Sequence, residues 1–327
     1  MRSSIDGEQK DVESRKVQRL GSSSLFITLP KKWINKWSIK PGDKVIMELE
    51  SNGSLKLTAE KVKVSPAKRS IRIDVDSTKQ QLGRTISCLY SLGYDEIMLE
   101  SKKSFGQKDF EEVMGSVKQM VGMEVTEIGD SLIKIDCLLD SEKVGIESLL
   151  RRMLNIVAKQ IDDISSSLIQ DKKRGNGKGT LEELRRVHYM LTRRIIGKRE
   201  EREGSFTLGY LALLAAQTLM TLTHHVEKME TLFPTLELGE EETRLVRGLL
   251  QKINDVLDEV VMTLIFPSYK RISNGFTMIS QSREELKELL RVRPDLTSLG
   301  YLLDSMLDLL EKAMENSSCG VFIEGNE

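Results

Sequence analysis

The stretch RKVQRLGSSSLFITLPKKWINKWSIKPGDKVIMELESNGSL, residues 15–55, decides the fold of the first part of this chain. Residues 16–20 alternate between polar and apolar side chains, a Gly-Ser-Ser-Ser break follows, and residues 25–29 have strong β propensity. Pro30 is typical of a helix start and predicts that a short helix follows. A Pro-Gly-Asp turn and an Asn-Gly hairpin turn then separate two further strands. The predicted order over residues 14–63 is β–β–helix–turn–β–turn–β. Because so small a unit has little core of its own, we expect it to dimerise.

The net charge of −1 over 327 residues conceals a separation of charge along the chain. Residues 14–63 contain eleven Lys/Arg and four Asp/Glu, a net of +7; residues 1–13 carry −2, which leaves −6 for residues 64–327. A basic segment joined to an acidic remainder predicts a nucleic-acid contact at the basic end, although surface lysines often do no more than solvate a protein.

The cellular compartment is also indicated by the sequence. Cys88, Cys137 and Cys319 lie far apart, odd in number, and fit neither a disulfide framework nor a CxxC metal site. Residues 1–16 are polar and lack the apolar region of a secretory signal, and no apolar run approaches the roughly 20 residues of a membrane span. We therefore expect a cytoplasmic protein with no membrane insertion.

The basic segment resembles a known family of DNA-binding domains. The resemblance is carried by Arg15-Lys16-Val17, Gly21, Ser24, LPKKW at 29–33, IKPGDKV at 39–45 and GSL at 53–55. These residues look like the AbrB/MazE/SpoVT family of swapped-hairpin domains, in which two chains interleave their hairpins as a homodimer and bind double-stranded DNA. The resemblance implies DNA contacts by the early basic residues Arg15, Lys16 and Arg19, to which we add Lys31 and Lys32. Ser22, Ser23 and Ser24 are expected to donate hydrogen bonds to phosphate oxygens.

Residues 69–140 predict a small α/β segment of order β-α-β-α-β-β. Expected strands are residues 71–75, 96–99, 124–128 and 132–137; one helix is expected after a Ser77 cap and ends at Gly93, and the other spans about 108–121. The segment contains no histidine, glycine-rich phosphate loop or nucleophile motif. A connector and a ligand-sensing unit both fit these features.

Residues 141–327 change to a helical period of 3.6. Helices are expected at about 145–170, 181–201, 206–232, 241–265, 283–291 and 296–316, with capping boxes at Thr180-x-x-Glu183 and Ser282-x-x-Glu285 and interruptions at Pro267 and Asn274-Gly275. The sequence LGYL at 208–211 recurs at 299–302. This repeat predicts two tandem three-helix bundles, and the chain as a whole is then multidomain.

The helical half resembles the PhoU family of phosphate-uptake regulators. The resemblance is carried by Leu150-Arg151-Arg152-Met153-Leu154 and by residues 219–229. Archaeal regulators that fuse an AbrB-like domain to a PhoU-like domain have this same order. The resemblance implies a divalent metal or iron bound by carboxylates at ExxxD spacing. The chain departs from that pattern through Met220, His224 and Arg185, and only Asp304 and Asp308 keep the spacing of metal ligands. Their stripe is equally interpreted as a solvated face.

The sequence favours a DNA-binding transcriptional regulator of phosphate uptake or homeostasis, with three domains at 14–63, 69–140 and 141–327. The alternative is a PhoU-type adaptor that regulates a phosphate-transport or signalling protein by protein–protein contacts. The +7 segment favours DNA, because an adaptor has no need of it. The residues provide no nucleophile–base spacing, so we do not expect an enzyme.

Overall fold

The computed structural model describes residues 13–21, 24–49, 53–60, 68–77, 81–139, 144–169, 177–197 and 205–321. The chain divides into two compact units, Met1–Ala67 and Lys68–Glu327. We call the described part of the first unit the head and that of the second unit the body, and each is described by itself.

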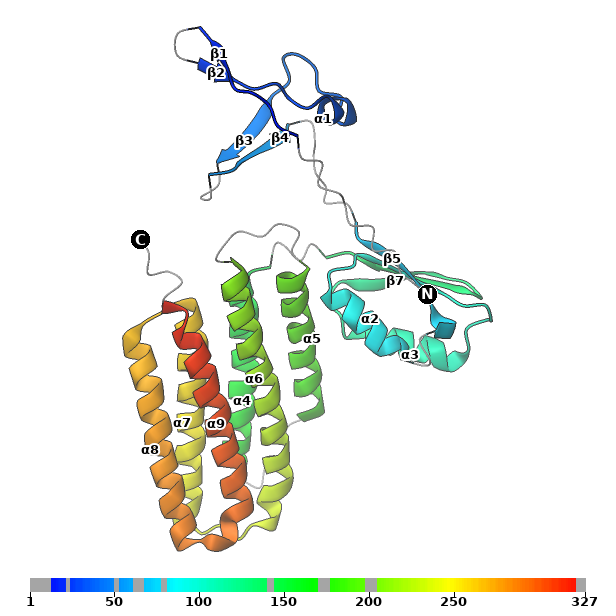
Figure 1. Cartoon of the computed structure of the whole chain (residues 1–327). Helices are drawn as coiled ribbons and strands as arrows, with labels where there is room; N and C mark the ends of the chain where they lie inside the picture. Colours follow the sequence, from blue (N-terminus) through cyan, green and yellow to red (C-terminus); the bar gives the residue numbers. More distant parts are fainter. Residues whose placement is uncertain are drawn as a thin grey trace. The chain divides into compact units, whose positions relative to one another are not determined.

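The head consists of two hairpins with a short helix between them in the chain (Figure 1). Its elements are β1 (Gln18–Leu20), β2 (Ser24–Phe26), α1 (Lys31–Lys36), β3 (Val45–Leu49) and β4 (Leu55–Ala59). β1 pairs with β2 and β3 with β4, both antiparallel, as two separate two-stranded sheets. Gly21, Gly42 and Gly53 have positive φ angles of 69°, 94° and 81°, which explains why glycine occupies these turns. The predicted order of elements is confirmed.

The first part of the body is a four-stranded sheet with two helices. Its elements are β5 (Ser70–Asp74), a 3₁₀ turn (Val75–Ser77), α2 (Leu82–Ser91), β6 (Glu96–Glu100), α3 (Gln107–Lys118), β7 (Met123–Ile128) and β8 (Leu132–Cys137). The strand order is β5-β6-β8-β7; β5 is parallel to β6, and the other pairs are antiparallel. Both helices lie on the same face of the sheet (Figure 1). The predicted order is confirmed, although the first helix begins at Leu82 rather than directly after Ser77.

Six long helices form the rest of the body (Figure 1). They are α4 (Ile146–Ser167), α5 (Gly177–Ile196), α6 (Ser205–Leu232), α7 (Glu240–Ile265), α8 (Tyr269–Val292) and α9 (Thr297–Ser318). Helices α4, α5 and α6 pack as one three-helix bundle and α7, α8 and α9 as another. The bundles join through α4 against α7 and α6 against α9, and their side chains form one continuous apolar core. The two tandem three-helix bundles predicted from the repeat are therefore present.

Two predicted helix starts are wrong. Helix α8 begins at Tyr269 and runs through Asn274-Gly275, so Ser282 lies within it rather than at its start. The Ser282 side chain is fully buried, and its hydroxyl donates to the carbonyl of Met278 at 2.8 Å. Gly275 is a packing residue, since a Cβ there would lie 2.2 Å from Cε of Met314 on α9. Thr180 likewise lies inside α5, which begins at Gly177.

The sheet and the bundles, expected as separate domains at 69–140 and 141–327, lie in one compact unit. Helix α2 packs against α5. Arg193 of α5 is 2% exposed and donates to the carbonyls of Tyr90 and Tyr94 at 3.0 and 2.7 Å and to a carboxylate oxygen of Asp95 at 2.6 Å. Among the described residues, none of the helices combines the length and apolarity needed to cross a membrane.

Candidate nucleic-acid interface

The basic residues expected to contact DNA lie on or next to two elements of the head. Arg19 is in β1, opposite Leu25 of β2, and Ser24 opens β2 opposite Leu20. Arg15 and Lys16 lie just before β1, outside any helix or strand. The three basic residues Arg15, Lys16 and Arg19 therefore lie within five consecutive positions, at the start of the first hairpin. Ser22 and Ser23 lie outside the described residues.

The basic side chains expected to contact DNA are exposed among the described residues of the head. Arg15 ion-pairs with Glu13 and donates from Nη1 to the carbonyl of Ser14 at 3.4 Å. Lys16 is exposed, as are Lys31 and Lys32 in the first turn of α1. Exposed ammonium and guanidinium groups on a net +7 segment are suited to phosphate binding, and the guanidinium also fits a bidentate contact with guanine.

The apolar side chains of the head lack a core. Of its hydrophobic side chains, only Ala59 is fully buried among the described residues. Ile46 and Met47 of β3 are 50% and 67% exposed although neighbouring strand residues point to opposite faces, so β3 is uncovered on both sides. The other apolar side chains of the head that are more than 40% exposed are Val17, Leu25, Ile27, Leu49 and Leu55. Burying these seven side chains would contribute roughly 10 kcal/mol. A two-stranded hairpin is marginal by itself, so the head needs a partner surface to be stable.

The acidic pair proposed as metal ligands is engaged by an arginine. Arg283 of α8 contacts Asp308 and Glu311 of α9 at 2.5 and 2.8 Å, and its Nε lies 3.8 Å from Asp304. The hydrogen bond from Arg283 lowers the pKa of Glu311, and the same interaction raises the pKa of the Arg283 guanidinium. No cluster of three or more His, Cys, Asp or Glu side chains able to hold a metal ion occurs among the described residues. The metal assignment therefore gains no support from the structure.

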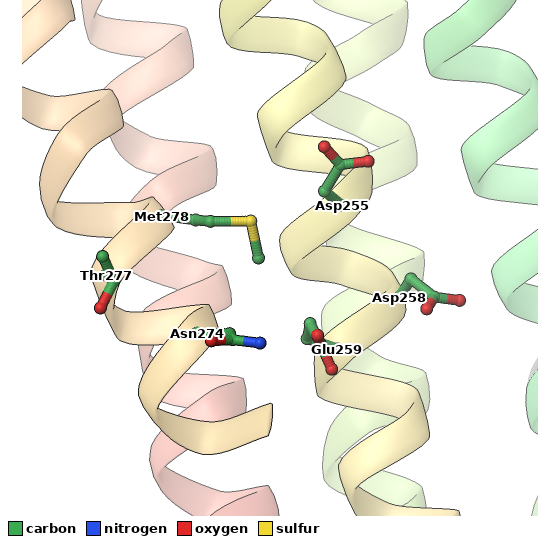
Figure 2. A pocket seen from close by; sticks show the side chains of 6 residues that line it. All are labelled: Asp255, Asp258, Glu259, Asn274, Thr277 and Met278. Carbon is green, nitrogen blue, oxygen red and sulfur yellow. The ribbon is translucent and has the colours of Figure 1, made fainter. Parts of the chain in front are cut away.

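Sequence reasoning missed an acidic hollow of about 430 Å³ between α7 and α8. It is lined by Asp255, Asp258, Glu259, Asn274, Thr277 and Met278 (Figure 2). Burial and the nearby Glu259 carboxylate raise the pKa of Asp258, and Arg271 pairs with Glu259 at 2.9 Å. Asp258 points away from α8, so the carboxylates do not converge (Figure 2). The signal available in the sequence was the spacing of Asp255 and Glu259, four residues apart on one helix face.

Two family models match parts of the chain. The first, antidote-toxin recognition MazE, bacterial antitoxin, matches residues 18–67, from the start of β1 past the end of β4. The head is therefore similar to DNA-binding domains of the MazE/AbrB type. The second, the Mnd1 HTH domain, matches residues 95–149. Neither model is of the PhoU family, so that resemblance stays a prediction. No curated protein and no solved structure matches the chain.

The fold of the second matched segment differs from a helix-turn-helix. Its described residues, 95–139 and 144–149, form β6, α3, the β7–β8 hairpin and the first residues of α4. A helix-turn-helix joins two helices by a turn of three or four residues. Here a β-hairpin separates α3 from α4. The two matches together favour a DNA-binding regulator.

Proposed function

We propose that this protein is a transcriptional regulator that binds double-stranded DNA as a homodimer through its head. The observation that carries the proposal is the coincidence of the MazE match at residues 18–67 with the +7 segment at residues 14–63. The exposed Arg15, Lys16 and Lys31 side chains supply cations for phosphate contacts, and Arg19, Lys32 and Ser24 complete the described part of the surface.

The homodimer is supported by the uncovered apolar strands of the head. A second head that contributes its hairpins would cover Ile46, Met47 and Leu49, which the single head leaves at least half exposed. Because homodimers are usually two-fold symmetric, the dimer carries two copies of the basic surface and favours an operator with two-fold symmetry.

The finer proposal is that the regulated process is phosphate uptake or homeostasis. It rests on the resemblance of residues 141–327 to the PhoU family, and the two three-helix bundles of the body agree with what that resemblance implies. In this proposal the body reports phosphate status or partner state to the head, and the protein acts in the cytoplasm.

Salt-dependent electrophoretic mobility shifts test the DNA-binding role. The probe is duplex DNA from the promoter of the protein's own gene or of a phosphate-transport operon. Replacing Arg15 and Lys16 by alanine removes four cations from a dimer. If all four contact phosphates, the slope of log K against log salt falls by about 3 to 4 units, and affinity falls at least about tenfold.

The matched control removes equal charge from the same domain. Lys40 and Lys44 are exposed beside the turn at Pro41-Gly42-Asp43, and their double alanine variant is expected to keep the wild-type slope. Equal slopes for both double variants would refute the assignment of Arg15 and Lys16. Failure of the wild-type protein to bind any promoter would refute the regulator and favour the adaptor, which acts by protein–protein contacts.

A further inference from the structure

Helix α6 presents an uncharged surface on a highly charged protein. Residues 207–226 contain no Asp, Glu, Lys or Arg, whereas 30% of the chain is charged. One side of this helix packs into the core of the body through residues that include Leu211, Ala215, Leu219 and Leu222. A surface helix normally carries charged and polar residues on the side opposite the core, and this segment carries none that is Asp, Glu, Lys or Arg.

The opposite side of α6 is uncovered in the single chain. Tyr210 is 54% exposed, Gln217 and His224 are exposed, and Leu214 and Thr221 are partly buried. Their spacing of three or four residues places them on one stripe, which we call the α6 face. From Tyr210 to His224 the stripe is about 20 Å long at 1.5 Å per residue.

The hydroxyl groups near this face are satisfied inside the helix. Thr218 donates to the carbonyl of Leu214 at 3.2 Å, and Thr221 donates to that of Gln217 at 2.9 Å. The methyl groups of these threonines are therefore available for contacts outside the helix, and burying the side chains leaves no hydroxyl donor without an acceptor.

The helices on either side of α6 are different. In the body α6 lies between α5 and α9 (Figure 1). The outward faces of these neighbours carry exposed charges that include Glu182, Glu183 and Arg186 on α5 and Asp304, Asp308 and Glu315 on α9. If the outward side of α6 only faced solvent, we would expect it to carry charged residues as its neighbours do.

We infer that the α6 face docks against the α6 face of a second copy of this chain. The inference rests on the proposed dimerisation of the head. Only the seven residues 61–67 separate β4 and its turn from the start of the body, and seven residues span at most about 25 Å. A head dimer therefore tethers two bodies at an effective concentration on the order of millimolar.

Charge explains why α6 is the contact. Each body carries a net charge of −6, so two tethered bodies repel each other through most of their surfaces. The α6 face lets them meet along a stripe without Asp, Glu, Lys or Arg; the first carboxylate, Glu227, lies at its end, 3.2 Å from Nδ1 of His224. A stripe of this size is too small to hold two free bodies, and it suffices here because the head supplies the tether.

Disulfide crosslinking of the full-length chain tests the inference. The exposed Cys88 and Cys319 are replaced by serine, which leaves the buried Cys137. Gln217→Cys then places a thiol on the α6 face, and Glu284→Cys places the control thiol on the exposed surface of α8. Under mild oxidation we expect the Gln217→Cys dimer to form at least about tenfold faster, at a rate that does not change on dilution.

A second variant and sedimentation velocity separate the outcomes. Adding Thr221→Glu to Gln217→Cys is expected to slow crosslinking about tenfold, because it sets two carboxylates against each other. A dimeric chain whose two cysteine variants crosslink equally fast would overturn the α6 contact alone. A monomeric chain would overturn both this contact and the dimeric head of the proposed function.

Discussion

Replacing Arg193 by methionine is expected to loosen the sheet part of the body from the helical bundles. The Arg193 guanidinium lies 5.0 Å from the ring of Tyr90 and bonds to the carbonyls of Tyr90 and Tyr94 and to Asp95. These partners follow one another at the end of α2, whereas Arg193 comes from α5. Methionine keeps an unbranched apolar side chain at the site and removes the charge and every donor.

The expected loss is about 3 kcal/mol. Removing one partner of a buried ion pair costs about 3–5 kcal/mol, since the other charge is left uncompensated. Two features favour the lower end. The Asp95 side chain is 19% exposed and keeps a hydrogen bond from the Arg69 backbone N–H at 2.9 Å. The carbonyl of Tyr90 still accepts the N–H of Gly93 at 3.0 Å.

Native-state hydrogen exchange of the α2 amides measures this loss at the contact between α2 and α5. A loss of 3 kcal/mol corresponds to exchange faster by roughly a hundredfold where opening of this contact exposes these amides. Urea unfolding of the full-length protein gives the matching change in the free energy of unfolding.

The control is Arg186→Met, which removes the same charge from an exposed position on the same helix. It is expected to change stability by less than about 0.5 kcal/mol. A loss below about 1 kcal/mol for Arg193→Met would show that the buried contacts do not hold the two parts together, and the reasoning would be wrong.

Three further predictions concern buried positions, and each is checked by urea unfolding. Gly93→Ala should lower the free energy of unfolding by more than about 2 kcal/mol, because φ is +85° and a Cβ would lie 2.6 Å from Cα of Gly197, just after α5. Its control, Gly115→Ala, places the Cβ in open space and should raise the free energy of unfolding by about 0.5–1 kcal/mol. Burial raises the pKa of Tyr90 above its ordinary value of 10, so stability should fall as pH rises past 10, less steeply in Tyr90→Phe. Gly275→Ala should lower the free energy of unfolding by about 1–3 kcal/mol, because its Cβ would meet Met314. In the double variant with Met314→Ala, the loss should be smaller than the sum of the two single losses; a loss equal to that sum would contradict the contact.

The elements with strong local signals were predictable from the sequence. Gly93, directly after the C-cap of α2, and Gly122, in the turn between α3 and β7, have positive φ angles of 85° and 81°, a conformation that few other residues adopt. The predicted second helix ends at Lys118, before Gly122. Alternation along β6 and β8 places Ile97, Leu99 and Ile133 in the core, as a sheet covered on one face requires. Local chemistry therefore determined the order of strands and helices, while their packing depends on contacts between distant residues.

The start of α8 was not predictable because it depends on such a contact. Asn274-Gly275 is a turn signal by itself. In the fold, Gly275 lets α8 approach Met314 of α9, and that packing outweighs a helix propensity loss of about 1 kcal/mol. The residue that decides the structure lies 39 positions away in the chain, beyond the reach of any local pattern.

The head and the acidic stripe of α9 illustrate the same limit for function. The basic segment was found from the sequence because charge and motif coincide within fifty residues. The spacing of Asp304 and Asp308 correctly places both on one helix face, but a spacing does not reveal the counter-ion. That counter-ion is Arg283, which comes from α8 and lies against the stripe only after the two helices pack. A carboxylate pair on one helix predicts a cation partner in general, and the tertiary fold decides whether the cation is a metal or an arginine. The same reasoning separates Arg193 from Arg186. The sequence favours a surface position for both, but the packing of α5 against α2 buries Arg193 and leaves Arg186 exposed.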